Sequence, residues 1–202
     1  MEIKRIPGGI LYTNTYIVFG GKTFVIDPGA DIEKIEKYLP EKGVDGILLT
    51  HGHLDHIYNM NILKEKYGAK VYIHKDDEKF LSDFSLSAPF GIPEGHEKRD
   101  YKADIILSDG DIIDMGGFSC RVIYTPGHTP GGVCFYFEKE KILFSGDTVF
   151  KGSYGRTDFP FGSYSDIMIS VKKLFSALPD EVRIYPGHGL STTVRAEKDI
   201  YL

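Results

Sequence analysis

Short apolar runs rich in β-branched and aromatic residues recur along the chain, and they predict β-strands. Residues 15–19 and 23–26 are two such runs on either side of Gly20 and Gly21, a pattern typical of a β-hairpin. Residues 46–50 form a continuous apolar run that leads directly into a histidine, as expected for a buried strand. Further strands are predicted over residues 70–74, 118–125, 133–137, 142–145 and 182–185.

Apolar residues spaced three or four positions apart predict helices between these strands. Ile32, Ile35 and Leu39 have this spacing, with Asp31 placed to cap the helix and Pro40 to end it. Other helices are predicted over residues 57–67, 165–178 and 192–199. Strands come first and helices follow in both halves of the chain. We therefore expect an α+β fold in which two sheets pack face to face and helices cover the outer faces.

The length and composition of the chain fit one globular domain. Of its 202 residues, 42% are hydrophobic and 26% are charged, so we interpret residues 1–202 as a single domain. Cys120 and Cys134 are the two cysteines and lie within predicted strands, which excludes a disulfide scaffold and indicates core positions. Residues 82–100 form the longest predicted loop and are a candidate lid or binding loop.

The charge and the hydropathy pattern limit the partners. A net charge of −5 argues against a nucleic-acid-binding protein. No apolar run is long enough to span a bilayer, and the N-terminus has no signal-peptide core. We therefore expect a soluble, cytoplasmic protein that binds neither nucleic acid nor a membrane, in an oligomeric state that the sequence leaves open.

Three imidazoles and a carboxylate gather within six residues, directly after a predicted strand. His51 and His53 alternate along an extended segment, so both can point toward one ion. Asp55 and His56 follow where a helix begins and can turn toward a second ion. Gly52 between the first two permits close approach of the backbone. A solvated, histidine-rich loop is the alternative, but an apolar strand that runs directly into these residues favours a metal site.

Three more ligand-type residues, His128, Asp147 and His188, each follow a predicted strand beside a glycine. If these strand ends meet at one rim, five histidines and two aspartates come together, more than the four ligands of one tetrahedral site. We therefore expect two ions. One is assigned to His51, His53 and His128 and the other to Asp55, His56 and His188, with Asp147 bridging them. Of the remaining histidines, His74 is interpreted as structural or surface and His96 as solvated.

The order of these motifs resembles the metallo-β-lactamase superfamily. The sequence His-x-His-x-Asp-His at residues 51–56 is followed by His128, Asp147 and His188, so the resemblance extends over most of the chain. It implies a four-layer αβ/βα sandwich with a dinuclear metal site at the edge between the two sheets.

Within the superfamily, Thr-Pro-Gly-His-Thr-Pro-Gly at residues 125–131 and Phe-Ser-Gly-Asp-Thr-Val-Phe at residues 144–150 are similar to segments of glyoxalase II, the hydroxyacylglutathione hydrolases. The segment from Pro186 to Glu197 is similar to short bacterial members, which lack the C-terminal helical domain that carries part of the glutathione site. We expect this chain to lack that domain as well, so the thiol-recognition residues of that domain have no counterpart here.

Residues 154–159, Tyr-Gly-Arg-Thr-Asp-Phe, resemble a segment of the persulfide dioxygenases, which hold one iron with two histidines and one aspartate. The matching positions here are His51, His128 and Asp147. Tyr154, Gly155 and Arg156 are candidate substrate-binding residues, with the Arg156 cation near a carboxylate or the peptide portion of a thiol. A surface ion pair between Arg156 and Asp158 is the alternative.

The resemblance implies a metal-dependent hydrolase that cleaves a small-molecule thioester, S-2-hydroxyacylglutathione or a similar thiol ester. A metal-bridging hydroxide would attack the acyl carbon, and Asp55 would hold its metal and orient the hydroxide. Two divalent ions are expected, with zinc preferred and iron or manganese as alternatives. The alternative activities are a mono-iron persulfide dioxygenase and a lactonase or other hydrolase of the same fold. A nuclease, a β-lactamase and a non-catalytic metal scaffold are disfavoured.

Overall fold

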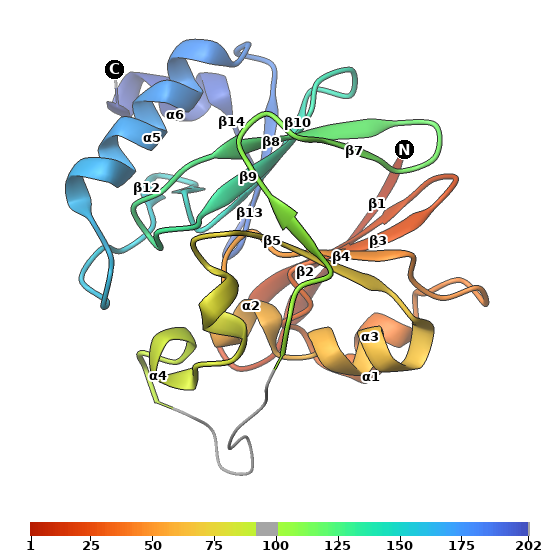
Figure 1. Cartoon of the computed structure of the whole chain (residues 1–202). Coiled ribbons are helices and arrows are strands. Elements are labelled where there is room, and N and C mark those ends of the chain that lie inside the picture. Colours follow the sequence, from red (N-terminus) through yellow and green to blue (C-terminus); the bar gives the residue numbers. More distant parts are fainter. Residues whose placement is uncertain (92–100, 202) are drawn as a thin grey trace.

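Two six-stranded β-sheets pack face to face in the computed structural model, which describes residues 1–91 and 101–201 (Figure 1). The first sheet has the order β1 (Glu2–Gly8), β2 (Thr13–Phe19), β3 (Thr23–Ile26), β4 (Gly46–Leu48), β5 (Lys70–His74) and β6 (Ile105–Leu107). β1, β2 and β3 are antiparallel, whereas β3 to β6 are parallel. β3 and β4 are buried along their whole length, which explains their continuous apolar sequence.

The second sheet is mostly antiparallel. Its order is β14 (Thr192–Thr193), β13 (Arg183–Pro186), β10 (Ile142–Gly146), β9 (Val133–Phe137), β8 (Ser119–Tyr124) and β7 (Ile112–Asp114). Only β10 and β13 pair in parallel within it. A separate hairpin of β11 (Val149–Phe150) and β12 (Ser153–Tyr154) follows β10.

Helices cover the outer face of each sheet, so the molecule has four layers (Figure 1). The first sheet is covered by α1 (Ile32–Glu36), α2 (Leu54–Ile57) and α3 (Met60–Tyr67), and the second by α5 (Tyr164–Ala177) and α6 (Val194–Tyr201). The 3-10 helix η1 (Glu78–Leu81) and α4 (Phe84–Ser87) follow β5. The expected α+β sandwich of two sheets with outer helices is therefore confirmed.

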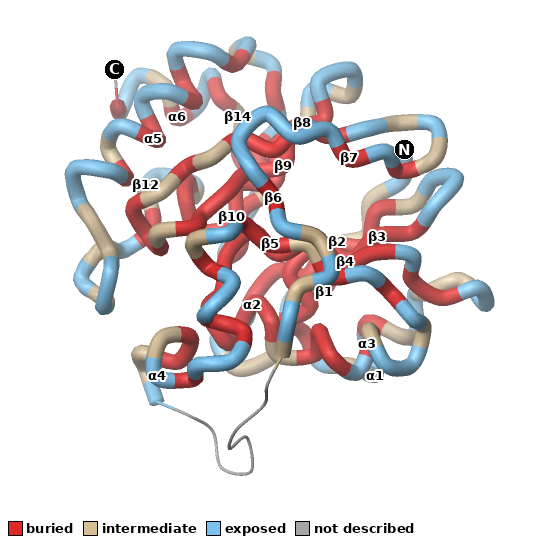
Figure 2. Tube along the Cα trace, viewed as in Figure 1, coloured by how far each residue is buried: buried red, intermediate tan, exposed pale blue. Residues whose placement is uncertain are grey.

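Three apolar clusters hold the layers together, and Figure 2 shows buried backbone throughout the centre of the molecule. The middle cluster lies between the sheets and contains aromatic residues such as Phe135, Phe137 and Phe144. The rings of Phe137 and Phe144 contact each other edge to face. Cys120 belongs to this cluster and Cys134 to the cluster beneath α5, and both are free thiols. The prediction that the cysteines are core residues is confirmed.

The predicted helix over residues 57–67 is wrong in one respect, because the structure divides this region into α2 and α3. Asn59 causes the break: its backbone N–H donates to the Pro28 carbonyl at 2.9 Å, and its side-chain amide donates to the Ala30 carbonyl at 2.6 Å. The N–H of Asn59 therefore bonds outside the helix. Gly68 ends α3 in the left-handed conformation, as its position just after the periodic residues indicates.

The structure also differs from the sequence prediction elsewhere, and α1 ends at Glu36, before Pro40. Asp31 precedes α1, but its side chain pairs with Lys34 at 2.7 Å instead of capping the helix. The predicted loop 82–100 contains α4, which Asp83 caps by accepting from the Ser85 N–H at 2.9 Å. Residues 92–100, including His96, lie outside the described residues. The closing helix begins at Val194 because the two preceding threonines pair with β13.

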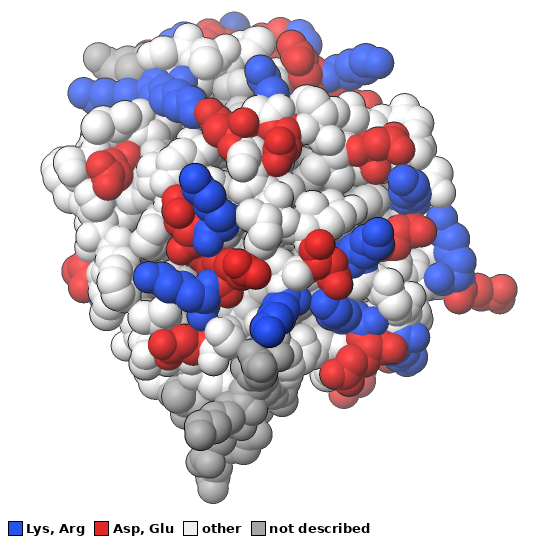
Figure 3. Space-filling model, in the orientation of Figure 1, with Lys and Arg blue, Asp and Glu red and all other residues white. Residues whose placement is uncertain are grey.

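Within residues 1–91 and 101–201, no helix has the length and apolar character needed to cross a membrane. On the face shown in Figure 3, lysine and arginine side chains alternate with aspartate and glutamate side chains rather than gathering in one patch.

Candidate metal centre

All seven candidate ligands lie at one edge of the sandwich, and each follows the end of a strand. His51 and His53 follow β4, and Asp55 and His56 are in α2 just beyond them. His128 lies in the turn between β8 and β9, Asp147 directly follows β10, and His188 follows β13. The structure thus brings together the residues that the sequence pattern singled out.

His51, His53 and His128, here called the first triad, place one ring nitrogen each within 4.8 Å of the others. The Nδ1 atom of His53 lies 2.9 Å from the Nε2 atom of His128. Burial lowers the pKa of all three imidazoles, that of His53 to about 3, and neighbouring imidazolium charges lower it further for His51 and His53. The rings are therefore neutral, which is the form that ligates metal.

Asp55, His56 and His188 form the second triad, whose ligand atoms also lie within 4.8 Å of one another. The Nε2 atom of His188 lies 3.3 Å from Asp55 Oδ2 and 3.3 Å from His56 Nε2. Burial lowers the pKa of His188, but hydrogen bonds to Asp147 and Asp55 outweigh it and raise the pKa to about 9. Carboxylates around the second triad therefore attract positive charge.

Asp147 lies between the two triads. Its Oδ1 is 3.4 Å from His56 Nε2, and its Oδ2 is 3.5 Å from both His128 Nε2 and His188 Nε2. Among the described residues, Asp147 Oδ1 and His51 Nε2 are buried polar atoms without a hydrogen-bond partner. Such atoms cost about 1–3 kcal/mol each when left unsatisfied. Two cations within this donor set would satisfy them, so the residues fit a dinuclear site.

Asp27 orients ligands of both triads from outside. One carboxylate oxygen accepts from the Thr50 hydroxyl at 2.6 Å and lies 2.9 Å from His56 Nδ1, and the other accepts from the Thr50 N–H at 2.8 Å. The Thr50 hydroxyl in turn lies 3.1 Å from His51 Nδ1. Asp27, His51 and His56 also qualify as a donor group by distance, but both oxygens of Asp27 already accept these hydrogen bonds. We therefore interpret Asp27 as a carboxylate that hydrogen-bonds the ring of the candidate ligand His56 and fixes its orientation.

Three consecutive buried residues at the start of β2 also support the site, and the sequence analysis missed them. Thr13 donates its hydroxyl to Asp55 Oδ2 at 2.7 Å. Asn14 holds the loop that carries His188 through its own N–H to Gly187 O at 2.7 Å and its side chain to Pro186 O at 2.9 Å. Thr15 fixes the turn of Asp27 by donating to its carbonyl at 2.6 Å and accepting from the Ala30 N–H at 2.9 Å. A run of polar residues opening an otherwise buried hairpin strand was the available signal.

A cavity of about 440 Å³ opens above the candidate ligands. Its apolar walls are Leu11, Phe90, Phe150 and Phe159, and its polar lining includes Ser153, Tyr154 and Arg156. Gly155 is not among the lining residues. It packs so closely on the backbone of Asp147 that a Cβ atom there would lie 1.8 Å from the Asp147 carbonyl oxygen.

The Arg156 guanidinium is engaged within the chain. Its Nε and Nη2 donate to the two carboxylate oxygens of Asp158 at 2.7 and 2.6 Å, and its charge lies 3.9 Å from the centre of the Phe159 ring. The ion pair foreseen as an alternative is therefore present. Arg156 also lines the pocket. Its backbone carbonyl accepts a hydrogen bond from His128 Nδ1 at 2.7 Å, which fixes the orientation of the His128 ring.

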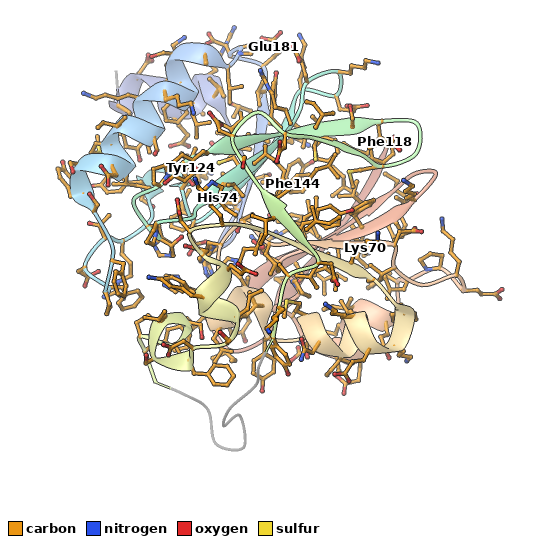
Figure 4. The ribbon with its side chains drawn as sticks, in the orientation of Figure 1. Lys70, His74, Phe118, Tyr124, Phe144 and Glu181 are labelled. Atoms are coloured by element: carbon orange, nitrogen blue, oxygen red, sulfur yellow. The ribbon has the colours of Figure 1, made fainter. Side chains whose placement is uncertain are left out.

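His74 lies away from the donor groups, as expected. It is buried and stacks on the ring of Tyr124 with centroids 4.5 Å apart, in the space between β5 and β8 (Figure 4). The Tyr124 hydroxyl donates to the Pro130 carbonyl at 2.9 Å, so this stack supports the turn that carries His128.

Comparisons with known proteins place this geometry in a family. The model of the metallo-beta-lactamase superfamily matches residues 8–188. The probable metallo-hydrolase YqgX of Bacillus subtilis is 34% identical over 98% of this chain and 95% of its own length. The hydroxyacylglutathione hydrolase GloC of Haemophilus influenzae is 32% identical over 98% of this chain and 95% of its own length.

Solved structures agree in fold. The BLEG-1 B3 metallo-beta-lactamase has a TM-score of 0.89 and 33% identity and covers 98% of this chain and 97% of its own. TTHA1623 in a di-iron-bound form has a TM-score of 0.81 and 34% identity and covers 96% of each chain. The chain therefore belongs to the metallo-beta-lactamase superfamily and has the fold of a metal-dependent hydrolase of that family.

Proposed function

We propose that the chain is a thioesterase of the glyoxalase II type, which hydrolyses S-2-hydroxyacylglutathione or a similar thiol ester with two divalent ions. The observation that carries this proposal is the position of Asp147 between two donor triads beneath one pocket. The first triad would hold one ion and the second triad the other, with Asp147 placed between them. Seven donors exceed what a single tetrahedral ion requires.

Two ions held here would supply a Lewis acid for the acyl carbonyl and would activate water as a nucleophile at neutral pH. The residues of the chain arrange the reactants. Asp55 lines the pocket, and because Thr13 holds its Oδ2, it keeps a fixed orientation toward an attacking water. The departing thiolate is weakly basic, so it requires little general-acid assistance.

The pocket walls support an acyl thioester substrate. Phe150 and Phe159 provide apolar surface on the side of the β11–β12 hairpin and of the segment that follows it. Tyr154 and Ser153 add hydroxyl groups that can orient a polar acyl or thiol portion. Such a mixture of apolar walls and a few polar groups is typical of small-molecule sites.

The relatives support both parts of the proposal. The full-length similarity to the hydroxyacylglutathione hydrolase of Haemophilus influenzae supports thioester cleavage. The di-iron form of TTHA1623 supports a two-ion site and supports iron, one of the expected alternatives, as its metal. Imidazole and carboxylate donors suit zinc equally, and zinc remains our first choice.

The similarity to the BLEG-1 B3 metallo-beta-lactamase favours β-lactam hydrolysis as a second candidate. A β-lactam carries a carboxylate, and the one cation among the described pocket-lining residues, Arg156, is already paired with Asp158. A glutathione thioester also carries carboxylates, so this pairing weakens charge recognition of both substrates, and the preference for the thioester rests on the relatives.

The test is metal analysis of untagged protein together with turnover assays on the same sample. About two divalent ions per chain and cleavage of S-lactoylglutathione would support the proposal. Cleavage of a cephalosporin or a lactone without thioester cleavage would replace the substrate class. About one iron per chain with oxygen uptake on glutathione persulfide would replace the hydrolase by a dioxygenase that uses His51, His128 and Asp147.

A further inference from the structure

A buried carboxylate joins the two loops that make up the first triad. Asp77 lies just before η1 and is fully buried. Its Oδ2 accepts a hydrogen bond from the N–H of Gly52 at 2.9 Å, and its Oδ1 accepts one from the N–H of Gly131 at 2.6 Å. Gly52 separates His51 from His53, and Gly131 lies in the turn that carries His128.

At both glycines the main chain lies too close to Asp77 or to η1 for a side chain to fit. A Cβ atom on Gly131 would lie 2.5 Å from the Asp77 nitrogen and 2.7 Å from its Cγ, and a Cβ atom on Gly52 would lie 2.4 Å from Phe80 Cβ. Neither glycine has a positive φ. They are needed because there is no room for a side chain where the main chain reaches Asp77, and not because of an unusual backbone conformation.

The contact is directional as well as tight. Each carboxylate oxygen of Asp77 accepts a hydrogen bond from one of the two loops. The rigid carboxylate group therefore fixes the distance between the loops. Hydrogen bonds from N–H groups to an ionised acceptor are strong, and a low-dielectric interior strengthens them further. Burial disfavours the charge and raises the pKa of Asp77 to about 6. An apolar residue would avoid this penalty, so the carboxylate is better explained by the two N–H groups that it holds.

The consequence reaches the donor atoms. His53 Nδ1 and His128 Nε2 lie 2.9 Å apart, but they belong to the two loops that Asp77 joins. A small movement of either loop changes the separation of these donors. The ring of Phe80, in η1, also lies 6.1 Å from the ring of His53, so η1 supports the same loop through packing.

We propose that Asp77 is a positioning residue that fixes the spacing of the two loops of the first triad and thereby sets the affinity for the first ion. The inference rests on the proposed dinuclear function. It assigns to Asp77 no contact with the ion or with the substrate.

The test compares Asp77→Asn with Asp104→Asn. Asp104 accepts a hydrogen bond from the Val71 N–H at 2.8 Å near the opposite end of β5, so it is a matched aspartate away from the site. Zn²⁺ is titrated into metal-free protein against a chromophoric chelator, and the visible absorption of the Co²⁺ form reports ligand geometry. For Asp77→Asn we expect about 10–100-fold weaker binding of one ion and an altered Co²⁺ spectrum, as for outer residues of other metal sites. Asp104→Asn should keep both binding constants.

A second variant reaches the contact from the other side. Gly131→Ala places a methyl group against Asp77 and should weaken the same ion, and in the double variant the two losses should be less than additive because they disrupt one contact.

The failures are distinguishable. Wild-type protein that takes up no divalent ion overturns the proposed function and this inference together. Wild-type protein that binds two ions, with unchanged constants and spectrum in Asp77→Asn and only a lower melting temperature, overturns this inference alone and leaves the proposed function in place.

Discussion

His53 and His128 face each other with Nδ1 and Nε2 atoms 2.9 Å apart, although 75 residues separate them in the chain. Two buried, neutral imidazoles in this arrangement are prepared to bind a cation without releasing protons at neutral pH. The second triad differs, because its carboxylates raise the pKa of its histidines. The two halves of the proposed site therefore differ in electrostatics.

Removal of ligands tests the proposed division. His128→Ala should lose the ion of the first triad. Because Asp147 lies between the triads, Asp147→Ala should lower the content of both ions. In each variant thioesterase activity should fall more than about 100-fold, the upper end of the effect of outer-sphere changes. Elemental analysis and turnover on the same samples provide the measurement. Full activity with stoichiometric metal in either ligand variant would contradict the assignment.

Asn14 should matter for the second triad. Asn14→Ala removes the side-chain bonds to the carbonyls of Pro186 and Gly189, at 2.9 and 3.0 Å, on either side of His188. We expect a loss of about 1–3 kcal/mol in the free energy of unfolding, because buried carbonyls lose their donors. We also expect lower occupancy of one ion.

The graded control for that variant is Tyr16→Phe, which removes a single hydrogen bond to the Pro186 carbonyl. It should reduce the free energy of unfolding by about 1 kcal/mol. Urea denaturation and metal titration separate the two effects. Equal effects of the two variants on metal occupancy would argue against a specific role for Asn14.

The Arg156–Asp158 ion pair should affect how strongly the pocket prefers thioesters of an anionic thiol over thioesters of a neutral thiol. Asp158→Asn frees the guanidinium at the pocket, so kcat/KM for a glutathione thioester should rise relative to a thioester of a neutral thiol, by about twofold to fivefold because exposed charges interact weakly. Added salt should reduce the gain. Asp109→Asn, which breaks the distant pair with Lys173, is the control. An unchanged ratio of the two substrates would show that Arg156 does not meet the thiol.

Asp77 should make stability depend on pH in a defined direction. Its pKa is raised by burial from 3.8 to about 6 in the folded protein. The folded state therefore binds a proton more tightly than the unfolded chain, so this group lowers stability as the pH rises through the window between about 4 and 6. The free energy of unfolding of wild type minus that of Asp77→Asn should fall by up to about 3 kcal/mol across this window.

Urea denaturation of metal-free protein between pH 4 and pH 7 measures that difference, since the other titrating groups are shared by both proteins. A difference that stays constant with pH would show that folding leaves the pKa of the Asp77 carboxyl unchanged, and a difference that grows as the pH rises would show that folding lowers it.

Much of the fold and the seven candidate ligands could be predicted because their signals are local. Alternation places His51 and His53 on one side of an extended segment, and the other ligands directly follow apolar runs. The strand β1 was not foreseen because it is largely half-exposed and carries charges within its sequence.

The supporting residues could not be predicted for the opposite reason. Thr13 and Asp55 are 42 residues apart, Asn14 and Pro186 are 172 apart, and Asp77 and Gly131 are 54 apart. No spacing along the chain reveals such pairs. The break at Asn59 has the same origin, since its partners lie in the turn before α1.

The division of the ligands between the two sheets has a consequence during synthesis on the ribosome. The first sheet is complete once β6 has emerged, and four of the seven candidate ligands precede that point. Neither triad is complete then, because one needs His128 and the other needs His188. N-terminal segments fold first as a chain is made. Metal capture by a full triad would therefore be a late step in biogenesis, and the second triad could bind an ion only after β13 and His188 have left the exit tunnel.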